Sequence, residues 1–572
     1  MDNGPSHRPA ARRRRLGCDD PPNPDYATWV IPAQTTSDQA APPIAVAPAP
    51  PRIRWALLIA LAGGLLLAAA FPPVGVWPLA AAGPALLLVA LSGRSLRASF
   101  AVGLVFGVAF FFPLLVWVTN VAWYAWIALA IASTVIFGVL TVGQRLLLRL
   151  PGWPLGVAGW WVAAEAVRDR WPWGGFPWGR LGMSQAGAPT QGWAAIGGAP
   201  LLSFMVALVG AMLGWLVLTA WPGRLPRGRT TLAAVAMVAT AALAAVPALL
   251  PLDPVAAGTP TTEVAAIQGD VPRARSLATQ LNDWMVTLNH VSATQALARA
   301  VAAGKKPAPD VVIWPENSTD IDPSLYPPVY NQIAAASAAI KTPILVGAVL
   351  ENPVRNASVL WLPGKGPVAT YVKQKLVPFG EYIPLRSVIS KITSLTALQP
   401  VNFTAGDKTV VFTVGKIRLS AMICWEVGFD SIARSEVTAG ANLLTMPSND
   451  ATYEREGETT GESGQQLAMA RIRAVEHDRS VVVASTTGYS AIIAPGGRLI
   501  TRSGLWQQAE LEARVPLVTH ITLADRVGPW PEYGIVAATG LGIVLAIALS
   551  WRRRLISAGP VSSSPGAEGD KH

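Results

Sequence analysis

The chain has 572 residues, of which 51% are hydrophobic and only 14% are charged, and its mean hydropathy is +0.38. Soluble domains carry about 25% charged residues, so this composition excludes an ordinary soluble protein and indicates one that meets lipid. The net charge of +11 does not indicate nucleic-acid binding, because the basic residues form short clusters at the ends of apolar runs and build no basic face interleaved with aromatic residues.

Residues 1–51 are rich in proline, alanine and charge, and we expect them to form a disordered tail. They contain Cys18, and the only other cysteine is Cys424. Two cysteines so far apart in sequence predict no structural disulfide, and two are too few to hold a zinc ion by themselves. We predict no metal site and no cofactor.

Apolar runs that could cross a bilayer come next. A spanning helix needs about 20 mostly apolar residues. The runs lie at 54–71, 75–92, 99–118, 121–142, 153–167, 196–221, 230–250 and 533–551. They predict a bundle of about eight transmembrane helices, with helices 1–7 inside residues 52–254 and helix 8 inside residues 531–553.

Arginine clusters indicate how these helices are oriented. Arginines stand before the first run and after the second, fourth, sixth and eighth runs, whereas the turns near 71–76 and at Asn120 carry no charge. Because basic residues mark the cytoplasmic ends of spans, both tails, 1–51 and 554–572, are expected in the cytoplasm. The part between the last two spans, residues 255–530, is then extracytoplasmic.

The loop 168–180 departs from this pattern, because it carries three arginines on the predicted outer side. It also contains Trp171, Trp173, Phe176 and Trp178. Aromatic residues gather at the headgroup level of a bilayer, so the loop is either an interfacial anchor or part of a rim through which lipid reaches a site.

From Glu263 onward, short β-branched runs alternate with helical stretches and turns. Strands are predicted at 264–269, 311–316, 344–350, 359–363, 410–414, 418–424, 443–447, 481–485 and 490–495, and helices at 275–303, 327–340, 427–439 and 462–478. Pro-Gly at 363–364 and Pro-Gly-Gly at 495–497 indicate hairpin turns. The alternation predicts a layered α/β fold for residues 255–530.

Three strand ends in this part carry reactive side chains: Glu316, Lys373 and Cys424. Singly, each has an ordinary structural interpretation, as a helix cap, a solvated lysine and a small buried residue. Together they meet the needs of a cysteine nucleophile, which requires a base or a cation near the thiol.

Histidine is the usual base, but the histidines of this part, His290, His477 and His520, lie in no such motif. Glutamate and lysine would take its place. A turn from strand to helix at Cys424 would also point backbone N–H groups at the sulfur, which would lower the pKa of the thiol and stabilise an oxyanion.

Glutamate, lysine and cysteine in this order, each at a strand end, resemble the nitrilase superfamily. Within it, the chain is similar to the apolipoprotein N-acyltransferase family over about residues 54–551. The resemblance is carried by WPE at 314–316, KLVPFGEYIP at 375–384, CWE at 424–426, SND at 448–450 and FPWGRLGMSQ at 176–185. It implies an α-β-β-α sandwich for residues 255–530.

The resemblance assigns roles to residues. Cys424 would be the nucleophile, Glu316 the general base and Lys373 the stabiliser of the oxyanion. Glu381 matches a second glutamate that supports the lysine and the base, and Glu426 and Trp425 match the residues beside the nucleophile. The chain departs from the family pattern at Gln374 and Lys375, where histidines are frequent, at Trp425, where tyrosine is common, and at 451–453, where a Trp-Phe pair is usual.

The implied reaction has two steps. A phospholipid donates a fatty acyl chain to Cys424 as a thioester, and the N-terminal amino group of a diacylglyceryl-cysteine apolipoprotein then accepts it. Such an enzyme is a multi-pass protein of the bacterial cytoplasmic membrane with its catalytic domain on the outer face, and its partners are the bilayer, the donor and the acceptor, with no nucleic acid. The segment 382–403 is the candidate lid, with a packed helix over the core as the alternative.

Three other functions stay open from the residues alone. A membrane-tethered nitrilase or amidase acting on a small amide would use the same three residues. A transporter would place ionisable residues inside the spans, where Glu165 is the main exception to an apolar pattern. A non-catalytic partner of another enzyme is expected to have lost one of the three reactive residues, and all three are present.

Overall fold

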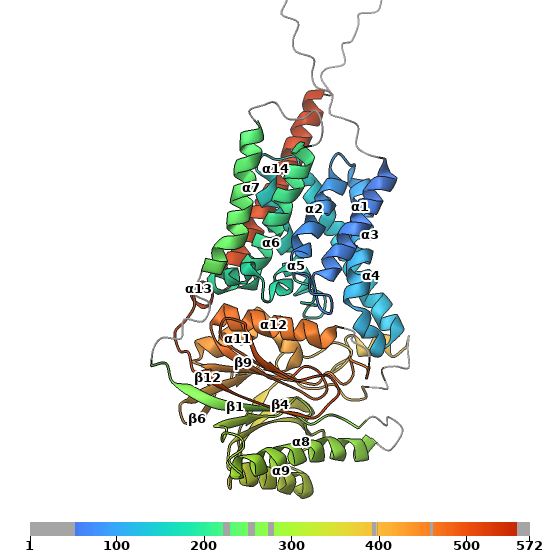
Figure 1. Cartoon of the computed structure of the whole chain (residues 1–572). Helices are drawn as coiled ribbons and strands as arrows, with labels where there is room; N and C mark the ends of the chain where they lie inside the picture. The colour runs from blue at the N-terminus through green and yellow to red at the C-terminus, as the bar shows by residue number, and fades with distance from the viewer. Residues whose placement is uncertain are drawn as a thin grey trace, which may run out of the picture. The chain divides into compact units, whose positions relative to one another are not determined.

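A helix occupies each of the apolar runs that the sequence marks (Figure 1). The structure is a computed structural model that describes residues 52–220, 229–249, 258–272, 279–391, 396, 399–457 and 461–557, so the predicted tail 1–51 and most of the predicted tail 554–572 lie outside the described residues. The helices are α1 Ile53–Ala69, α2 Leu79–Leu91, α3 Leu96–Leu114, α4 Trp123–Leu147, α5 Trp153–Arg168, α6 Trp193–Ala220, α7 Arg229–Ala245 and α14 Trp530–Ser557.

Length separates these helices into two groups. In the described part of the chain, four helical segments are long and apolar enough to cross a membrane: Leu96–Leu114, Trp123–Leu147, Pro189–Thr219 and Trp530–Arg552. The remaining ones are shorter, and α2 has only 13 residues. At 1.5 Å per residue such a helix covers about 20 Å, less than the hydrocarbon core of a bilayer. The prediction of about eight spans is therefore supported for four helices and stays a prediction for the others.

The ionisable residue that the sequence places inside a span is engaged locally. Glu165, near the end of α5, accepts hydrogen bonds from the indole of Trp161 at 3.0 Å and from the backbone N–H of Leu181 at 2.7 Å. Leu181 begins a 3₁₀ turn, η2 Leu181–Gln185. The carboxylate therefore holds the segment that follows the loop 168–180 against α5.

The basic clusters meet at one end of the bundle. The Arg145 side chain donates to the carbonyl of Arg94 at 2.6 Å, which joins the end of α4 to the turn after α2. Arg149 donates to the hydroxyl of Ser550 on α14 at 3.1 Å. The ends that the sequence predicts to share one side of the membrane are therefore neighbours.

The uncharged turns lie at the other end, against the α/β part. Gln465 donates to the carbonyl of Pro72, in the turn between α1 and α2, at 3.2 Å. Asn120, in the 3₁₀ turn η1 Val116–Asn120, donates to the carbonyl of Tyr453 at 2.7 Å. The alternation of charged and uncharged loops thus corresponds to two opposite ends of the bundle.

The α/β part contains two six-stranded sheets, with the orders β12-β1-β2-β3-β4-β5 and β11-β10-β9-β8-β7-β6. Parallel pairs join β1, β2 and β3 in one sheet and β7, β8 and β9 in the other, and the outer pairs are antiparallel. The strands are β1 Thr261–Gln268, β2 Val311–Ile313, β3 Ile344–Leu350, β4 Arg355–Leu362, β5 Gly366–Val372, β6 Phe412–Val414, β7 Ile417–Ala421, β8 Leu443–Ser448, β9 Ser480–Ser485, β10 Ala491–Ile493, β11 Leu499–Arg502 and β12 Ala509–Pro516.

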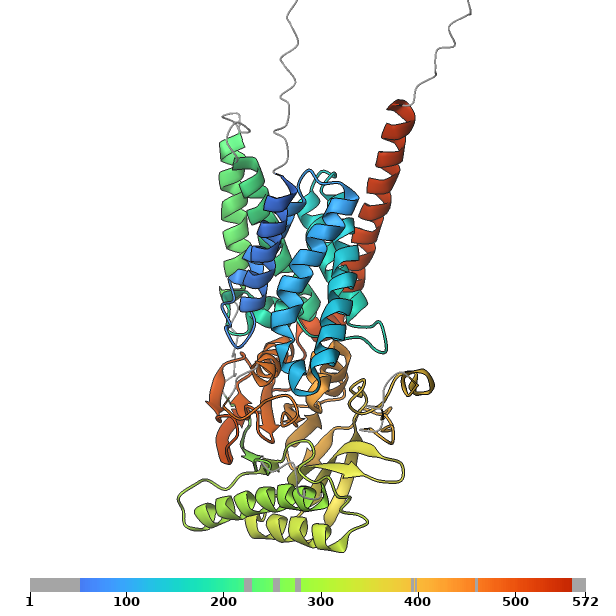
Figure 2. The same cartoon turned by 90° about the vertical axis from the view of Figure 1, so that its right-hand side faces the viewer.

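Helices cover the outer face of each sheet (Figures 1 and 2). One apolar cluster fills the space between the sheets, and a second lies between the first sheet and helices α8 Thr279–Ala302 and α9 Pro327–Ile340. The second sheet is covered by α11 Asp430–Thr438 and α12 Glu462–His477. This layering confirms the expected α-β-β-α sandwich. The predicted hairpin turns also lie where the sequence puts them, between β4 and β5 and between β10 and β11.

The bundle and the α/β part share apolar packing. α12 packs against α6, and α13 Leu523–Val527, the short helix before α14, packs against α6 as well. A single cluster of buried side chains contains Phe110 and Trp178 from the bundle together with Trp425 and Leu467 from the α/β part. The α/β part is therefore seated on the helices, with α12 between the second sheet and the bundle.

Candidate functional site

Glu316 and Lys373 form a buried ion pair between two strand ends. Glu316 follows β2 and Lys373 follows β5, and their side chains are 4% and 1% exposed. Lys373 Nζ lies 2.8 Å from Glu316 Oε1 and 3.0 Å from Glu381 Oε1. Burial alone would lower the pKa of Lys373, but the carboxylates of Glu316 and Glu381 hold it well above its ordinary value. The lysine is therefore a fixed cation.

The two carboxylates beside the lysine are held by further donors. Asn356, near the start of β4, donates its amide to Glu316 at 2.6 Å and to Glu381 at 2.8 Å. The backbone N–H of Val377 binds the other oxygen of Glu381 at 2.7 Å. The outer oxygen of Glu316 accepts the backbone N–H of Asn449, which follows β8 in the second sheet, at 3.0 Å. Donors from both sheets thus keep Glu316 in place.

Gly347 shows how closely the backbone approaches this site. A Cβ atom at Gly347 on β3 would lie 2.0 Å from the carbonyl oxygen of Pro315 and 2.8 Å from the Cα atom of Glu316. Because both are backbone atoms, no side chain could move aside. The bend that carries Glu316 needs a glycine on the neighbouring strand.

Cys424 lies at a sharp turn after β7. It begins a 3₁₀ turn, η6 Cys424–Gly428, and α11 starts only at Asp430. Its φ is +50°, a left-handed conformation that is uncommon for a non-glycine residue and is found at strained functional positions. The expected change from strand to helix is thus a tight turn, and the N-terminus of an α-helix does not begin at the sulfur.

The thiol is protonated at rest. Burial and the carboxylate of Glu316 raise the pKa of the Cys424 thiol well above its ordinary value, and the nearby Lys373 only partly opposes them. The expected lowering of this pKa is therefore wrong, because the side chain is 4% exposed and its acidic neighbours outweigh the cation. A thiol in this state needs its proton removed as it attacks, which a neighbouring carboxylate can do.

This leads to a prediction for alkylation. Modification of Cys424 by iodoacetamide should be slow at pH 7 and should rise about tenfold per pH unit through at least pH 9, because only the thiolate reacts. Peptide mapping by mass spectrometry after timed exposure, in detergent, separates Cys424 from Cys18. A rate that levels off below pH 8 would contradict the raised pKa of the thiol.

Glu426 holds the turn that begins at Cys424 in place. Its carboxylate is fully buried and accepts the Tyr371 hydroxyl at 2.9 Å, the backbone N–H of Ile423 at 2.8 Å and that of Gln374 at 2.7 Å. Burial raises its pKa to about 7 despite these donors. Glu426 therefore joins the turn that begins at Cys424, in the second sheet, to the strand end that carries Lys373 in the first.

Residues beyond the predicted set also reach the reactive groups. Gln466 on α12 places its amide nitrogen 3.6 Å from Cys424 Sγ, and the same nitrogen contacts the carboxylate of Glu462. Its oxygen accepts the Ser448 hydroxyl at 2.9 Å. Asn356 is the other addition. The signal in the sequence was weak in both cases: Asn356 is one of three polar residues in β4, and Gln466 is one of two adjacent glutamines in α12.

The histidines of the α/β part have partners elsewhere. His477 pairs with Asp525 at 2.7 Å, and His520 pairs with Asp478 at 2.8 Å. His290 packs beside Trp314, and burial lowers its pKa to about 4. That a glutamate takes the place of the usual histidine base stays a prediction.

The loop 168–180 reaches from the bundle to the turn that begins at Cys424. The ring of Trp178 stacks on that of Trp425, with centroids 4.8 Å apart and planes at 13°, and Phe176 lies 5.5 Å from Trp425. Trp171 and Trp173 are 63% and 48% exposed. The loop therefore divides into an inner part that supports Trp425 and an outer part open to its surroundings, so both interpretations of its aromatic residues have a physical basis.

The three arginines that break the charge pattern each lie near a carboxylate. Arg170 pairs with Glu532 at 2.8 Å, Arg180 forms a two-pronged pair with Asp430 at 2.7 and 3.0 Å, and Arg168 lies 3.9 Å from Asp169. Charges that are paired inside the protein do not orient a span as free ones do. The arginines of the loop 168–180 are therefore compatible with the orientation predicted from the other arginine clusters.

Arg180 and Asp430 supply a second prediction. Burial disfavours a charged Asp430, yet Arg180 and Arg473 hold its pKa well below the ordinary value. Replacing Arg180 by methionine removes a buried guanidinium and leaves Asp430, whose side chain is 30% exposed, paired with Arg473. The change should lower Tm by about 5–10 °C, measured by thermal unfolding in detergent. The matched control is Arg514→Met, because Arg514 is 71% exposed and pairs with Glu263 at 3.3 Å. Equal Tm values for the two variants would contradict a stabilising role for the buried pair.

A cavity of about 400 Å³ opens beside Trp425. It lies between the loop 168–180, which contributes Trp173, and the segment after β5, which contributes Lys375 and Tyr382. The Tyr382 hydroxyl donates to the carbonyl of Trp173 at 3.0 Å. The cavity therefore lies against Trp425, the residue next to Cys424, while Cys424, Glu316 and Lys373 are not among its lining residues.

The candidate lid, 382–403, is only partly described. Its described portion contains one helical turn, α10 Arg386–Ile389, with no buried residue, and Leu385 and Val388 are 62% and 52% exposed. Ile392, Leu395 and Leu398 lie outside the described residues. The alternative of a helix packed over the core does not fit α10, and a lid stays a prediction.

Comparisons with known proteins cover almost the whole chain. The family model described as Apolipoprotein N-acyltransferase N-terminal domain matches residues 63–212, and the model described as Carbon-nitrogen hydrolase matches residues 263–524. An apolipoprotein N-acyltransferase from Mycolicibacterium smegmatis is 40% identical over 512 residues, which cover 86% of this chain and 85% of that protein.

More distant relatives carry the same name. Apolipoprotein N-acyltransferases from Pseudomonas paraeruginosa and Azotobacter vinelandii are 29% and 30% identical, over 87% and 88% of this chain and 96% of each relative. Among solved structures, an amidase from Nesterenkonia sp. aligns at 18% identity with a TM-score of 0.33, over 45% of this chain and 91% of that one.

Proposed function

Because the chain belongs to the apolipoprotein N-acyltransferase family, we propose that it transfers a fatty acyl chain from a membrane phospholipid, through a thioester on Cys424, to the N-terminal amino group of a diacylglyceryl-cysteine apolipoprotein. The relatives that cover most of the chain support an N-acyltransferase that acts on lipoproteins. The donor, the thioester and the residue roles are our proposal.

The observation that carries the proposal is the buried pair of Glu316 and Lys373 beside the Cys424 thiol. The two side chains are joined at 2.8 Å, and their charges act in opposite directions on the pKa of the thiol: Glu316 raises it and Lys373 lowers it. Burying an ion pair costs desolvation energy, and side chains with shifted pKa values are concentrated at active sites. A buried ion pair at this place is therefore expected to have a function.

In the first half-reaction, Glu316 takes the proton of the Cys424 thiol while the sulfur attacks an ester carbonyl of the phospholipid. The carbonyl oxygen becomes negatively charged, and Lys373 together with backbone N–H groups stabilises it. When the tetrahedral intermediate collapses, the carbon–oxygen bond of the ester breaks. The proton held by Glu316 passes to the leaving oxygen, and a lysophospholipid departs while the acyl chain remains on sulfur.

In the second half-reaction, the α-amino group of the apolipoprotein attacks the thioester carbonyl. Glu316 accepts a proton from the nitrogen, the same donors stabilise the oxyanion, and the carbon–sulfur bond breaks to form an amide. The proton returns to sulfur. Sulfur leaves as a thiolate, and because the pKa of the resting thiol is raised, Glu316 must return the proton to it. The same carboxyl group therefore accepts and returns the proton in both half-reactions.

The packing of the α/β part on the helix bundle supports the proposal that the substrates are lipids. The cavity beside Trp425 has one wall from the loop that follows α5 and one from the segment after β5, so an acyl chain could approach from the level of the helices. Donor and acceptor are both anchored in a membrane, and confinement in one plane raises their effective concentration. We propose that Trp171 and Trp173 form the outer rim of this route, and that 382–403 covers it.

Orientation in the membrane follows from charge. The bundle ends that carry Arg94, Arg145 and Arg149 lie opposite the ends that meet the α/β part. With basic ends in the cytoplasm, the α/β part would lie on the outer face of the bacterial cytoplasmic membrane. The predicted parts (tail 1–51, helices in 52–254, catalytic domain 255–530, last helix 531–553 and tail 554–572) belong to this proposal.

The second candidate is a membrane-tethered nitrilase or amidase that acts on a small amide. The match of residues 263–524 to the carbon-nitrogen hydrolase model favours it, because the same three residues would serve amide hydrolysis. The amidase function does not explain the extensive packing between α12 and the bundle, because a membrane tether needs only one helix.

A reconstituted assay distinguishes these functions. The purified full-length protein is incubated with phospholipid and a synthetic diacylglyceryl-cysteine peptide, and separately with acetamide and butyramide. Lipoprotein acylation predicts a peptide heavier by one acyl group and an equal amount of lysophospholipid, with no ammonia from the amides. Ammonia release without peptide acylation would overturn the proposal in favour of the amidase.

A further inference from the structure

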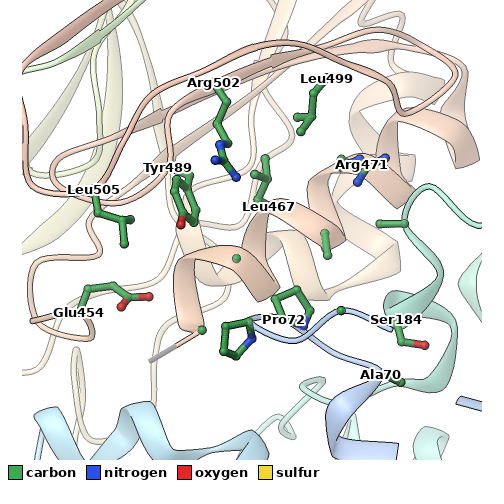
Figure 3. A pocket seen from close by; sticks show the side chains of 16 residues that line it. Ala70, Pro72, Ser184, Glu454, Leu467, Arg471, Tyr489, Leu499, Arg502 and Leu505 are labelled. Carbon is green, nitrogen blue, oxygen red and sulfur yellow. The ribbon is translucent and has the colours of Figure 1, made fainter. Parts of the chain in front are cut away.

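A second cavity of about 400 Å³ lies on the other side of α12 from the nucleophile. Its walls come from the turn between α1 and α2, which contributes Pro72, from η2, which contributes Ser184, and from α12 and the hairpin of β10 and β11 (Figure 3). Cys424, Glu316 and Lys373 do not line it. The reaction proposed above uses no residue of this cavity.

The two faces of α12 explain why the cavity is separate. Gln466 and Glu462 lie one turn apart on the face that reaches Cys424. Gly464, Leu467 and Arg471 belong to the face that lines the cavity. Residues three and four apart share a side of a helix, so α12 itself is the wall between the two spaces.

Two arginines give the cavity its charge. Arg471 and Arg502 line it from α12 and β11, and Figure 3 shows the Arg502 guanidinium extending into the space. Arg502 lies 4.4 Å from the centre of the Tyr489 ring, and Arg471 Nε donates to the carbonyl of Gly497 at 2.8 Å. These contacts fix the guanidinium groups while leaving further N–H donors on each. Burial lowers the pKa of Arg471, so an anion beside it would be favourable.

The acidic side chain in the lining is already engaged. Glu454 is 3% exposed and accepts the backbone N–H of Ser463 at 2.9 Å. Among the described lining residues, two cations therefore face one anion, which leaves a net positive space. Leu467, Leu499 and Leu505 supply an apolar wall next to it. A ligand with a phosphate and an alkyl portion would match both the positive charge and the apolar wall of the cavity.

The rim of the cavity lies where the helices end. In the turn between α1 and α2, Val74, Val76 and Trp77 are 61%, 45% and 37% exposed. Exposed apolar and tryptophan side chains at a helix end are typical of the headgroup level of a bilayer. A lipid from the membrane could therefore enter beside Pro72 without leaving the interface.

From this geometry we propose that the cavity lined by Arg471 and Arg502 binds the phosphate-bearing headgroup of a phospholipid that is retained at the junction of the bundle and the α/β part and is not the acyl donor. The two guanidinium groups bind phosphate oxygens, for which arginine is well suited. The glycerol and upper alkyl carbons lie along the leucine wall. The site does not depend on the reaction at Cys424, so either proposal can fail alone.

The test uses a lipid that cannot donate an acyl chain. Dialkyl-ether phosphatidylglycerol has no ester, and native mass spectrometry of the full-length protein in detergent counts the lipids bound at each concentration. The wild type should retain one lipid more than Arg502→Gln, and the apparent Kd for that lipid should rise about tenfold in the variant, the effect of losing one charge-assisted contact. Arg502 is exposed, so its replacement should leave folding intact.

Controls decide between the possible ligands. Arg514→Gln changes an exposed arginine that pairs with Glu263 and does not line the cavity, so this variant should bind as the wild type does. A dialkylglycerol without phosphate should bind equally to the wild type and Arg502→Gln. Equal retention of the phospholipid by both proteins would overturn the proposal. So would displacement of the ether lipid by inorganic phosphate at equal concentration, because the site would then take a free anion.

Discussion

Replacing Lys373 by methionine should reduce acyl transfer by about 10³-fold, because the cation that faces the developing oxyanion is removed. The same change leaves Glu316 and Glu381 buried side by side without their shared partner, and Asn356 alone cannot balance two carboxylates. Breaking a buried pair in this way costs about 3–5 kcal/mol. The variant should therefore lose both activity and stability. Single-turnover acylation and thermal unfolding measure the two effects.

The matched control is Lys365→Met. Lys365 is an exposed lysine in the turn between β4 and β5, in the same hairpin as Lys373 but outside the site. It should keep both Tm and the acylation rate. To separate the two effects in Lys373→Met, the rate is compared at a temperature where both proteins are folded. An unchanged rate there would remove Lys373 from the chemistry and leave it a structural role.

The variant Glu316→Gln should slow acylation by about 10²–10⁴-fold while changing stability much less. Glutamine keeps the size of the side chain and can still accept the N–H of Asn449, but it cannot take the thiol proton. Lys373 retains Glu381 as its counter-ion at 3.0 Å, so no buried cation is left alone. The rates of formation and decay of the acyl-enzyme should both fall, because one base serves both half-reactions.

The pH dependence provides an additional readout. In Glu316→Gln the residual rate should rise steeply with pH, since hydroxide must replace the missing base and the thiol pKa is raised. Glu263→Gln on β1 is the matched control, because Glu263 pairs with the exposed Arg514 and lies outside the site. If Glu316→Gln keeps the wild-type rate at pH 7, the proton must go to another group, and Glu462 on α12 would be the next candidate.

The helices and the sandwich could be predicted because their signals are local. Apolar runs and short β-branched runs are recognised within short stretches of neighbouring residues. The helix predicted at 327–340, for example, has the same bounds as α9. Strands β5, β11 and β12 are absent from the predicted strands, although Lys373, which follows β5, was expected at a strand end. β12 carries charged residues at alternating positions, which is the period-2 pattern of a half-buried strand, so a local signal was present. Its pairing with β1, from Thr261 opposite Pro516 to Gln268 opposite Ala509, is what no local window reveals.

The site was predictable only in part for a related reason. Glu316, Lys373 and Cys424 stand in recognisable motifs, but the partners that fix them come from distant parts of the chain. Asn356 and Gln466 become meaningful only when β4 and α12 are folded against the site. The raised pKa of Cys424 likewise depends on its burial and on the acidic groups around it, so the sequence suggested the opposite direction.

The measurement that tests the central claim most directly is the intact mass of the protein after incubation with phospholipid alone. The account predicts a mass increase of one acyl chain that is released by hydroxylamine, maps to the peptide of Cys424 and is absent in Cys424→Ser. A folded wild-type protein that gains no such adduct, while acylating a lipoprotein peptide in the same preparation, would contradict the thioester and require direct transfer from the phospholipid.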